Sequence, residues 1–354
     1  MTEYGDGFAS AGSGYGSGKA ILEVRDLVTE FTTDEGSQRA VNGVSFSLQA
    51  GQTLAVVGES GSGKSVTSLS VMGLLPARIG HIAAGSIQLD GRELVGLPER
   101  AMRRVRGNEI GMIFQEPMTS LTPVYTVGDQ IVEAILSHRN VSRSVARKRA
   151  VELLDQVGIP EPKLRARAFP YQLSGGMRQR VMIAIALACN PRVLIADEPT
   201  TGLDVTIQAQ ILDLLRRLQK ETGMAILFIT HDLGVVAEIA DRVLVMYAGH
   251  KVEEADVEDL FASPRMPYTI GLLQSTPRPG ASALKLGTAP RLRAIRGNIP
   301  SPRDLPEGCP FNPRCDHMRE GVCTTALPSL EDSGSGHLVR CARWRNVAIE
   351  EVSV

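Results

Sequence analysis

The sequence predicts an α/β protein with a parallel-sheet core, an antiparallel β subdomain, a helical subdomain and a small irregular C-terminal domain rich in cysteine. Three observations lead to this prediction. Short apolar runs at residues 53–58, 193–197 and 225–230 alternate with helical segments, as in buried parallel strands joined by crossover helices. Alternating apolar and polar residues near the start are typical of half-buried strands. Beyond about Phe261, frequent prolines and glycines indicate irregular structure.

The composition is that of an ordinary globular protein. The chain has 354 residues and a formal net charge of −1, with 22% charged and 43% hydrophobic residues. This length favours two or three domains, and the near-neutral charge argues against nucleic acid as a partner. The longest apolar candidate, residues 181–196, is interrupted by Asn190, Pro191 and Arg192, so we expect no membrane-spanning helix and a cytosolic protein.

The elements follow in order from the flexible Gly/Ser-rich tail that we expect over residues 1–19. Two alternating segments, near residues 21–31 and 40–51, predict an antiparallel strand pair. The apolar strand at 53–58 leads into a glycine-rich turn and a helix. Residues 116–172 carry helical periodicity and predict a helical insertion, and residues 241–255 predict a closing hairpin. We place a domain boundary near residue 261.

A phosphate-binding loop is predicted between the apolar strand and the following helix. The segment matches the pattern GxxxxGK[ST], in which glycines let backbone N–H groups converge on phosphate oxygens. Lys64 would neutralise the β- and γ-phosphates, and Ser65 would ligate Mg²⁺. The predicted ATP-binding residues of this loop are Gly58, Glu59, Ser60, Gly61, Ser62, Gly63, Lys64 and Ser65.

Two acidic residues complement this loop. Asp197 ends the apolar strand at residues 193–197, where its carboxylate can hold Mg²⁺ directly or through water. Glu198 follows it and can orient or deprotonate the attacking water. An apolar strand ending in Asp-Glu is common and mostly structural when it stands alone, so this interpretation depends on the phosphate loop.

A second anion-binding turn decides the class of nucleotide-binding protein. Ser174, Gly175 and Gly176 lie in the sequence LSGGM directly before a long helix, and offer a hydroxyl and backbone N–H groups at a positive helix end. With this element the sequence resembles the ATP-binding cassette (ABC) family of P-loop NTPases. The resemblance implies that two cassettes face head to tail, so that this turn covers the nucleotide of the partner. Met177 departs from the glutamine that is commoner in the family.

Other cassette elements appear in the expected order. The resemblance implies that Gln115 reaches Mg²⁺ and the attacking water, that Asp204 lies in the loop that crosses to the partner cassette, and that His231 contacts the γ-phosphate. Phe31, at the end of the first strand, would stack on adenine, although a core position is the alternative. The cassette would cover residues 20–260, with its helical subdomain at about 116–190.

A narrower resemblance covers almost the whole chain. Residues 115–131, 266–273 and 295–315 are similar to ATP-binding subunits of dipeptide and oligopeptide importers. The resemblance implies two transmembrane permease subunits, a second ABC ATPase in a heterodimer rather than a homodimer, an extracytoplasmic peptide-binding protein and a peripheral location at the cytoplasmic face of the membrane. Alternatives are another cargo such as a nickel chelate or haem, a soluble ABC ATPase outside transport, and a regulatory subunit that clamps ATP without hydrolysing it.

Four cysteines lie close together in the extension at residues 261–354. They are Cys309, Cys315, Cys323 and Cys341. Reducing conditions in the cytosol disfavour disulfides, and the spacing lacks the close pairs of a structural zinc site. A [4Fe–4S] cluster tolerates wider spacing and occurs in some members of the importer family, whereas zinc and free thiols stay as alternatives. Cys189 lies in an apolar helix and is predicted to be a core residue.

Overall fold

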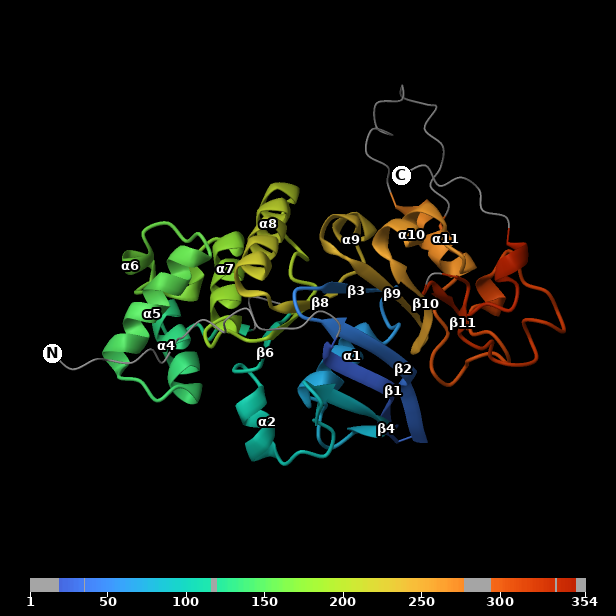
Figure 1. Cartoon of the computed structure of the whole chain (residues 1–354), viewed down its shortest axis with the longest axis horizontal. Coiled ribbons are helices and arrows are strands. Elements are labelled where there is room, and N and C mark those ends of the chain that lie inside the picture. The colour runs from blue at the N-terminus through green and yellow to red at the C-terminus, as the bar shows by residue number, and fades with distance from the viewer. Residues whose placement is uncertain (1–18, 35, 116–119, 277–293, 335, 348–354) are drawn as a thin grey trace, which may run out of the picture. The chain divides into compact units, whose positions relative to one another are not determined.

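The computed structural model describes residues 19–34, 36–115, 120–276, 294–334 and 336–347 (Figure 1). The predicted tail at 1–19 therefore lies outside the described residues except for Lys19. The chain divides into two compact units. Unit 1 comprises residues 1–23, 47–52 and 88–228, and unit 2 comprises residues 24–46, 53–87 and 229–354. In the described part of the chain, no helix has the length and apolarity to cross a bilayer.

Unit 1 contains a parallel sheet segment and the helical insertion. In the sheet, β6 and β7 pair in parallel, with Ile110 opposite Val193 and Ile113 opposite Ala196, and β8 lies next to β7. The strands and helices of this unit are α2 (Glu99–Val105), β6 (Ile110–Ile113), α4 (Val127–His138), α5 (Arg143–Gln156), α6 (Pro162–Arg165), η1 (Pro170–Gln172), α7 (Gly175–Ala186), β7 (Val193–Asp197), α8 (Val205–Thr222) and most of β8 (Ala225–Ile229).

The two clearest predicted helices of the insertion are confirmed as α4 and α5, and each has a side-chain cap at its start. Thr126 accepts a hydrogen bond from the backbone N–H of Asp129 and begins α4, and Ser142 accepts from Val145 and begins α5. The predicted core position of Cys189 is also confirmed, since the residue is 1% exposed.

Unit 2 contains the glycine-rich turn and the C-terminal region. Its strands follow the order β11-β12-β10-β9-β3, with β3 parallel to β9 and the predicted hairpin β9–β10 antiparallel. Most of a second sheet, in the order β2-β1-β4, lies in the same unit. These strands are β1 (Ala20–Thr33), β2 (Gly36–Gln49), β3 (Thr53–Val57), β4 (Gly80–Leu89), β9 (Arg242–Tyr247), β10 (His250–Asp256), β11 (Glu331–Asp332) and β12 (Leu338–Val339).

The helices of unit 2 are short. They are α1 (Lys64–Met72), α9 (Leu233–Ile239), α10 (Val257–Ala262), α11 (Pro267–Ser275), η3 (Asn312–Arg314) and η4 (Trp344–Asn346). Helix α11 is absent from the sequence interpretation, which expected irregular structure throughout this region. It forms because Pro267 occupies the first helical position, where a missing N–H costs nothing.

Two strands were not predicted from the sequence: β4 and the short strand β5 (Arg92–Glu93), which pairs with the end of β4. The turn between them is Asp90-Gly91, and both residues have positive φ values, 50° and 79°. Asp-Gly between alternating residues is a strong signal for a tight hairpin. The dipeptide could therefore have revealed this hairpin.

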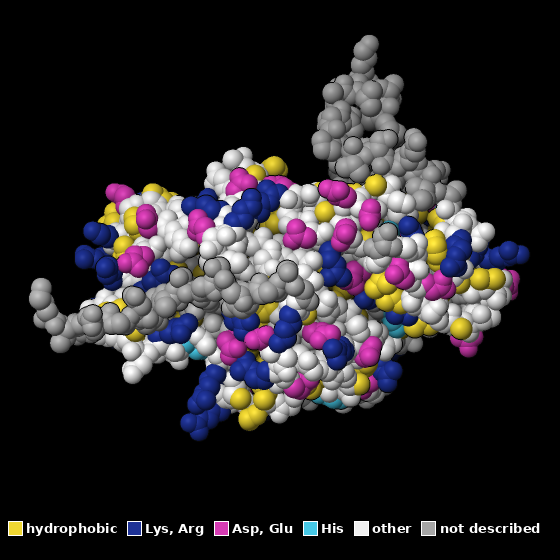
Figure 2. Space-filling model, in the orientation of Figure 1, with side chains coloured by type: hydrophobic (Ala, Val, Ile, Leu, Met, Phe, Trp, Pro, Cys, Tyr) yellow, Lys and Arg dark blue, Asp and Glu magenta, His cyan; other side chains and the backbone are white. Residues whose placement is uncertain are grey.

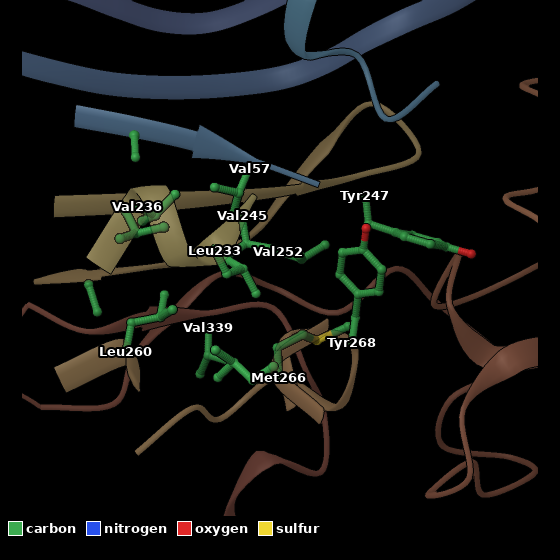
Figure 3. Packing of buried hydrophobic residues seen from close by; sticks show 14 of the residues in the cluster. Val57, Leu233, Val236, Val245, Tyr247, Val252, Leu260, Met266, Tyr268 and Val339 are labelled. Atoms are coloured by element: carbon green, nitrogen blue, oxygen red, sulfur yellow. The ribbon is translucent and has the colours of Figure 1, made fainter. Parts of the chain in front are cut away.

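The core of unit 2 joins the β3–β9–β10 strands to the C-terminal region (Figure 3). Val57 and Val245 belong to the same buried cluster as Tyr268, Phe311 and Val339. Strand β12 extends the sheet by pairing with β10, Val339 lying opposite Glu253. The boundary predicted near residue 261 stays a prediction, and packing in this unit continues across it.

The visible surface carries mixed charges. Figure 2 shows Lys and Arg side chains interspersed with Asp and Glu over the face in view. This agrees with the net charge of −1.

His250 at the start of β10 makes the stability of unit 2 pH-dependent. Burial, and next the nearby Arg340, lower its pKa to about 4. The unfolded chain binds this proton at about pH 6.5, so the contribution to stability is present above that pH and is lost as the pH falls toward 4. Between pH 7 and pH 5 we expect a loss of about 2 kcal/mol from this group.

Denaturation of the native chain and of His250→Gln at several pH values checks this expectation. The variant should lose about 2 kcal/mol less than the native chain over the same interval. His81→Gln, at an exposed histidine, is the matched control and should follow the native chain. Equal pH slopes in His250→Gln and the native chain would contradict the assignment.

Candidate nucleotide-binding site

The glycine-rich turn of unit 2 is a tight backbone loop between β3 and α1. Gly58, Gly61 and Gly63 have φ values of 150°, 82° and 103°, which side-chain-bearing residues rarely adopt. A Cβ atom on Gly58 would lie 2.2 Å from the carbonyl oxygen of Met246, and one on Gly63 would lie 2.6 Å from that of Ala40. Glycine is therefore required at both positions by space as well as by conformation.

The Lys64 side chain curls back into this loop. Its Nζ donates to the carbonyl oxygens of Gly58 at 2.7 Å and Glu59 at 2.9 Å, and the residue is 5% exposed. The loop thus surrounds a buried ammonium group at the N-terminus of α1. Such an arrangement suits a bound phosphate chain. Of the other predicted residues, Ser60 and Gly61 are exposed, Ser62 is buried, and Ser65 is half-buried.

Two further predicted residues lie in unit 2. Phe31 is half-buried near the end of β1, and its ring lies against Gly80, where a Cβ would be 2.9 Å from Cε1. His231 is exposed just after β8, between Thr230, whose N–H donates to the carbonyl of Val56, and Asp232, which caps α9. The backbone on both sides of His231 is therefore anchored.

Unit 1 brings the predicted catalytic acid and glutamine together. Gln115 Nε2 donates to Glu198 Oε2 at 3.0 Å, and Thr201 Oγ1 donates to the same oxygen at 2.9 Å. Glu198 has a φ of 48°, an unusual value for a residue other than glycine, whereas Asp197 ends β7 and is 5% exposed. Strained residues concentrate at functional sites, so this conformation is consistent with a catalytic position.

The LSGGM turn begins a helix in unit 1. Ser174 Oγ accepts from the backbone N–H of Met177 at 3.3 Å and caps α7. A Cβ on Gly176 would lie 2.8 Å from Ile207 of α8, so this glycine allows close packing. Asp204 is exposed and caps α8 by accepting from Ile207 N–H at 3.0 Å. Ser174 and Asp204, both predicted to bind nucleotide, thus also cap helices within unit 1.

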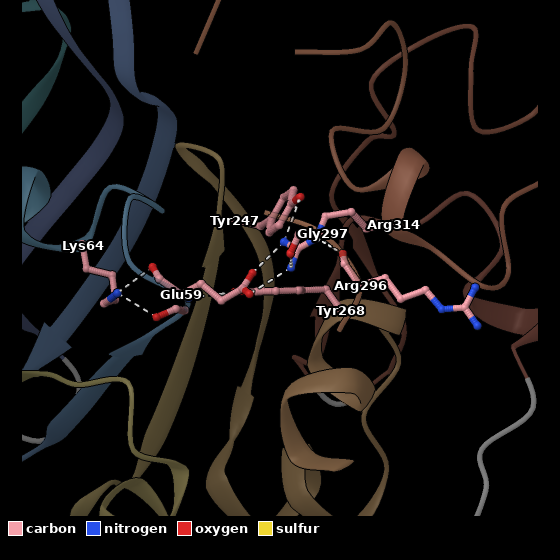
Figure 4. Close-up of polar contacts among 8 residues, drawn as sticks. Glu59, Lys64, Tyr247, Tyr268, Arg296, Gly297 and Arg314 are labelled. Atoms are coloured by element: carbon pink, nitrogen blue, oxygen red, sulfur yellow. Dashed lines mark hydrogen bonds and ion pairs between the residues drawn. The ribbon is translucent and has the colours of Figure 1, made fainter. Parts of the chain in front are cut away.

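The phosphate loop pattern did not reveal the partners of Glu59. Figure 4 shows that Arg314 and Tyr268, both from the C-terminal region, contact this residue. The sequence carries no signal for such contacts, because Glu59 is separated from each of the two residues by more than 200 positions.

The four clustered cysteines lie near one another in unit 2. Burial, and after it the neighbouring thiols of the cluster, raise the pKa of Cys315 to about 12 and that of Cys341 to about 11. The backbone N–H of Cys309 donates to the carbonyl oxygen of Cys323 at 2.9 Å. Over the described ranges, however, no group of three or more His, Cys, Asp or Glu side chains is placed to hold a metal ion.

Comparison with known proteins assigns the family. Residues 41–201 match the ABC transporter family, and residues 252–323 match the C-terminal region of oligopeptide/dipeptide transporters. A protein of Brucella melitensis named as a peptide import ATP-binding protein is 55% identical over 337 residues, which cover 94% of this chain and 99% of that protein. The chain belongs to the ABC transporter family.

A second relative and a solved structure support the same family assignment. The oligopeptide transport ATP-binding protein AppD of Bacillus subtilis is 51% identical over 331 residues, covering 94% of this chain and 99% of AppD. The solved dimeric cassette MJ0796 has a TM-score of 0.60 at 29% identity, covering 67% of this chain and 99% of that cassette. The predicted α/β ABC cassette fold is therefore confirmed, and membership of this family makes the chain an ATPase.

The clash at Gly58 predicts which glycine of the phosphate loop tolerates change least. Gly58→Ala must displace the Met246 carbonyl and should lower stability by about 1–3 kcal/mol, with weaker ATP binding. Gly61→Ala is the matched control, because φ is also positive there but no atom lies within 4 Å of the added Cβ. Thermal unfolding and ATP titration compare the two variants. Equal losses in both would show that the backbone conformation alone matters.

Proposed function

We propose that the chain is the ATP-hydrolysing subunit of an importer for dipeptides or oligopeptides. The observation that carries this proposal is the phosphate loop folded around Lys64, in a chain whose C-terminal region matches the oligopeptide/dipeptide transporter type. ATP would bind to the loop from Gly58 to Ser65, with Phe31 under the adenine. The signature turn at residues 174–176 and Asp204 would contact the nucleotide of a second cassette.

Each catalytic residue has a distinct role in this proposal. Glu198 orients and deprotonates the attacking water, and Gln115, hydrogen-bonded to it, holds the carboxylate in place. Lys64 and His231 stabilise the charge that develops on the γ-phosphate. Ser65, Gln115 and Asp197 would hold Mg²⁺, which when bound neutralises phosphate charge. The Gln115–Glu198 contact and the burial of Asp197 support these assignments.

The partners in this proposal are two permease subunits, a second ABC ATPase and an extracytoplasmic peptide-binding protein. Support for a membrane partner comes from the segment after Gln115, where Val124 and Tyr125 are 71% and 56% exposed. Exposed apolar side chains close together suit a protein interface. The chain would then work at the cytoplasmic face of the membrane. A heterodimer with a different ATPase is the arrangement proposed.

Two variants test the function in the assembled transporter, reconstituted with its binding protein. Lys64→Ala should lower ATP affinity itself, by about 10-fold or more, because the loop loses its positive charge. Glu198→Gln should keep ATP binding, stop hydrolysis and trap the paired cassettes, because only the base is lost. ATP titration, phosphate release and uptake of labelled peptides are measured on both.

Equal loss of ATP binding in the two variants would contradict the roles assigned. A transporter that hydrolyses ATP but takes up a nickel chelate or haem instead of peptides would contradict the cargo. Absence of Mg²⁺-dependent ATP hydrolysis in the native assembly would contradict the assignment as an ATPase.

We also propose that the four clustered cysteines hold a [4Fe–4S] cluster, with zinc as the alternative. In the described part of the chain the thiols are not arranged as a set of metal ligands, so cluster binding would require them to move closer to one another. Support comes from the proximity of the four thiols, since Cys309, Cys323 and Cys341 all act on the Cys315 thiol. Burial favours the neutral thiols, so iron would displace their protons on binding.

Anaerobic purification followed by iron, sulfide and zinc analysis tests this proposal. The native chain should hold about four irons and four sulfides, and Cys315→Ser should lose most of them. Cys189→Ala, which removes the cysteine of unit 1, is the control and should keep them. Stoichiometric zinc without iron would favour the alternative, and no bound metal would leave the cysteines as thiols.

A further inference from the structure

The C-terminal region contacts the phosphate loop through an ion pair between Arg314, whose side chain is 5% exposed, and Glu59, whose side chain is 31% exposed. Arg314 Nη1 donates to Glu59 Oε2 at 2.7 Å, and Nη2 donates to Oε1 at 2.9 Å (Figure 4). Two parallel bonds between a guanidinium and a carboxylate fix the orientation of both groups. All the groups involved belong to unit 2. The loop's acidic side chain is therefore held by a residue far away in the sequence.

The remaining donors of Arg314 are also used. Nε donates to the carbonyl oxygen of Arg296 at 2.7 Å, and Nη2 donates to that of Gly297 at 3.0 Å. The Arg314 side chain is 5% exposed, and the hydrogen bonds to Glu59 raise its pKa. A charge so deeply buried needs its partner, because removing one member of a buried pair leaves the other uncompensated.

Tyr268 makes a second contact with the same loop residue. The backbone N–H of Glu59 donates to Tyr268 Oη at 2.8 Å. Tyr268 is fully buried, and its ring packs edge-on against Tyr247 and Phe311, with centroids 4.7 Å and 5.4 Å away. Because these rings belong to the core of the unit, the hydroxyl is presented to the loop from a rigid surface.

The start of α11, which carries Tyr268, is itself anchored. Glu253 is fully buried on β10 and accepts from the backbone N–H groups of Arg265 at 2.6 Å and Met266 at 3.2 Å. His337 Nε2 lies 2.7 Å from the same carboxylate. The sheet therefore fixes the position of the helix, and the helix fixes the tyrosine.

The charge of Glu59 explains why such an anchor matters. A carboxylate in a loop that binds a triphosphate repels the ligand unless a cation compensates it. Glu59 also accepts, through its carbonyl oxygen, a hydrogen bond from Lys64 Nζ. Neutralising the side chain and holding the backbone of this one residue would therefore act on both the charge and the shape of the loop.

We propose that Arg314 and Tyr268 are positioning residues for ATP: together they neutralise and hold Glu59, and thereby keep the phosphate loop in its binding conformation. This inference rests on the proposed function, in which that loop binds ATP. Both residues would act on the nucleotide through Glu59. The C-terminal region thus sets the affinity of the cassette for ATP.

Titration of the full-length chain with MgATP tests the proposal. Arg314→Met should raise the Kd about 10-fold, because it leaves the Glu59 carboxylate uncompensated in the loop. The double variant Glu59→Gln/Arg314→Met should recover most of the lost affinity, since it removes the repelling charge as well. Tyr268→Phe removes only the hydroxyl and should raise the Kd about threefold. In the assembled transporter, Arg314→Met should raise KM for ATP and leave kcat within about twofold.

Arg319→Met is the matched control, because this arginine is exposed in the same region. Its Kd should equal that of the native chain. Thermal unfolding is followed for every variant, and if Arg314→Met does not fold, Tyr268→Phe decides the matter. A native Kd in Tyr268→Phe and in any folded Arg314→Met overturns the proposal, as does a double variant as weak as the single one.

The same titration separates this inference from the function on which it rests. A native chain that binds no MgATP means that the proposed function fails. A native chain that binds MgATP, with binding lost in Lys64→Ala but unchanged in Arg314→Met and Tyr268→Phe, overturns only the positioning roles.

Discussion

Close packing of the phosphate loop against the strand β9 is the constraint on which unit 2 depends. Strand β3 ends at Val57, and the next residue, Gly58, passes so near the Met246 carbonyl that no side chain fits. The parallel pairing of β3 with β9 therefore determines the path of the loop. Because β9 continues into β10 and β10 pairs with β12, the same sheet also positions the C-terminal region.

Much of this architecture can be predicted from the sequence, because strong local patterns determine it. The glycine spacing from Gly58 to Gly63 specifies the loop, and apolar runs such as residues 193–197 specify buried strands. Cap residues such as Ser142 mark helix starts directly. The Asp90-Gly91 dipeptide is an equally local signal for a hairpin. It was overlooked because the residues on either side of it alternate only weakly between apolar and polar.

Contacts between distant residues could not be predicted in the same way. Glu59 occupies a variable position of the loop pattern, and its partner Arg314 lies in a segment with little regular structure. Helix α11 was missed because the many prolines nearby obscured the one that starts a helix. The Gln115–Glu198 contact could be predicted only in part. The resemblance to cassettes names both residues, but the hydrogen bond between them and the positive φ of Glu198 are known only from the structure.

The shared core of unit 2 has a consequence for how this protein can be divided. The solved cassette MJ0796 corresponds to 67% of this chain, which suggests that a shorter fragment would suffice. Here, however, Val57 and Val245 share one buried cluster with Phe311 and Val339. A fragment ending before residue 261 would expose that apolar surface to water. It would also leave the Glu253 carboxylate without its partner His337. Subcloning the minimal nucleotide-binding module would therefore yield an aggregation-prone polypeptide.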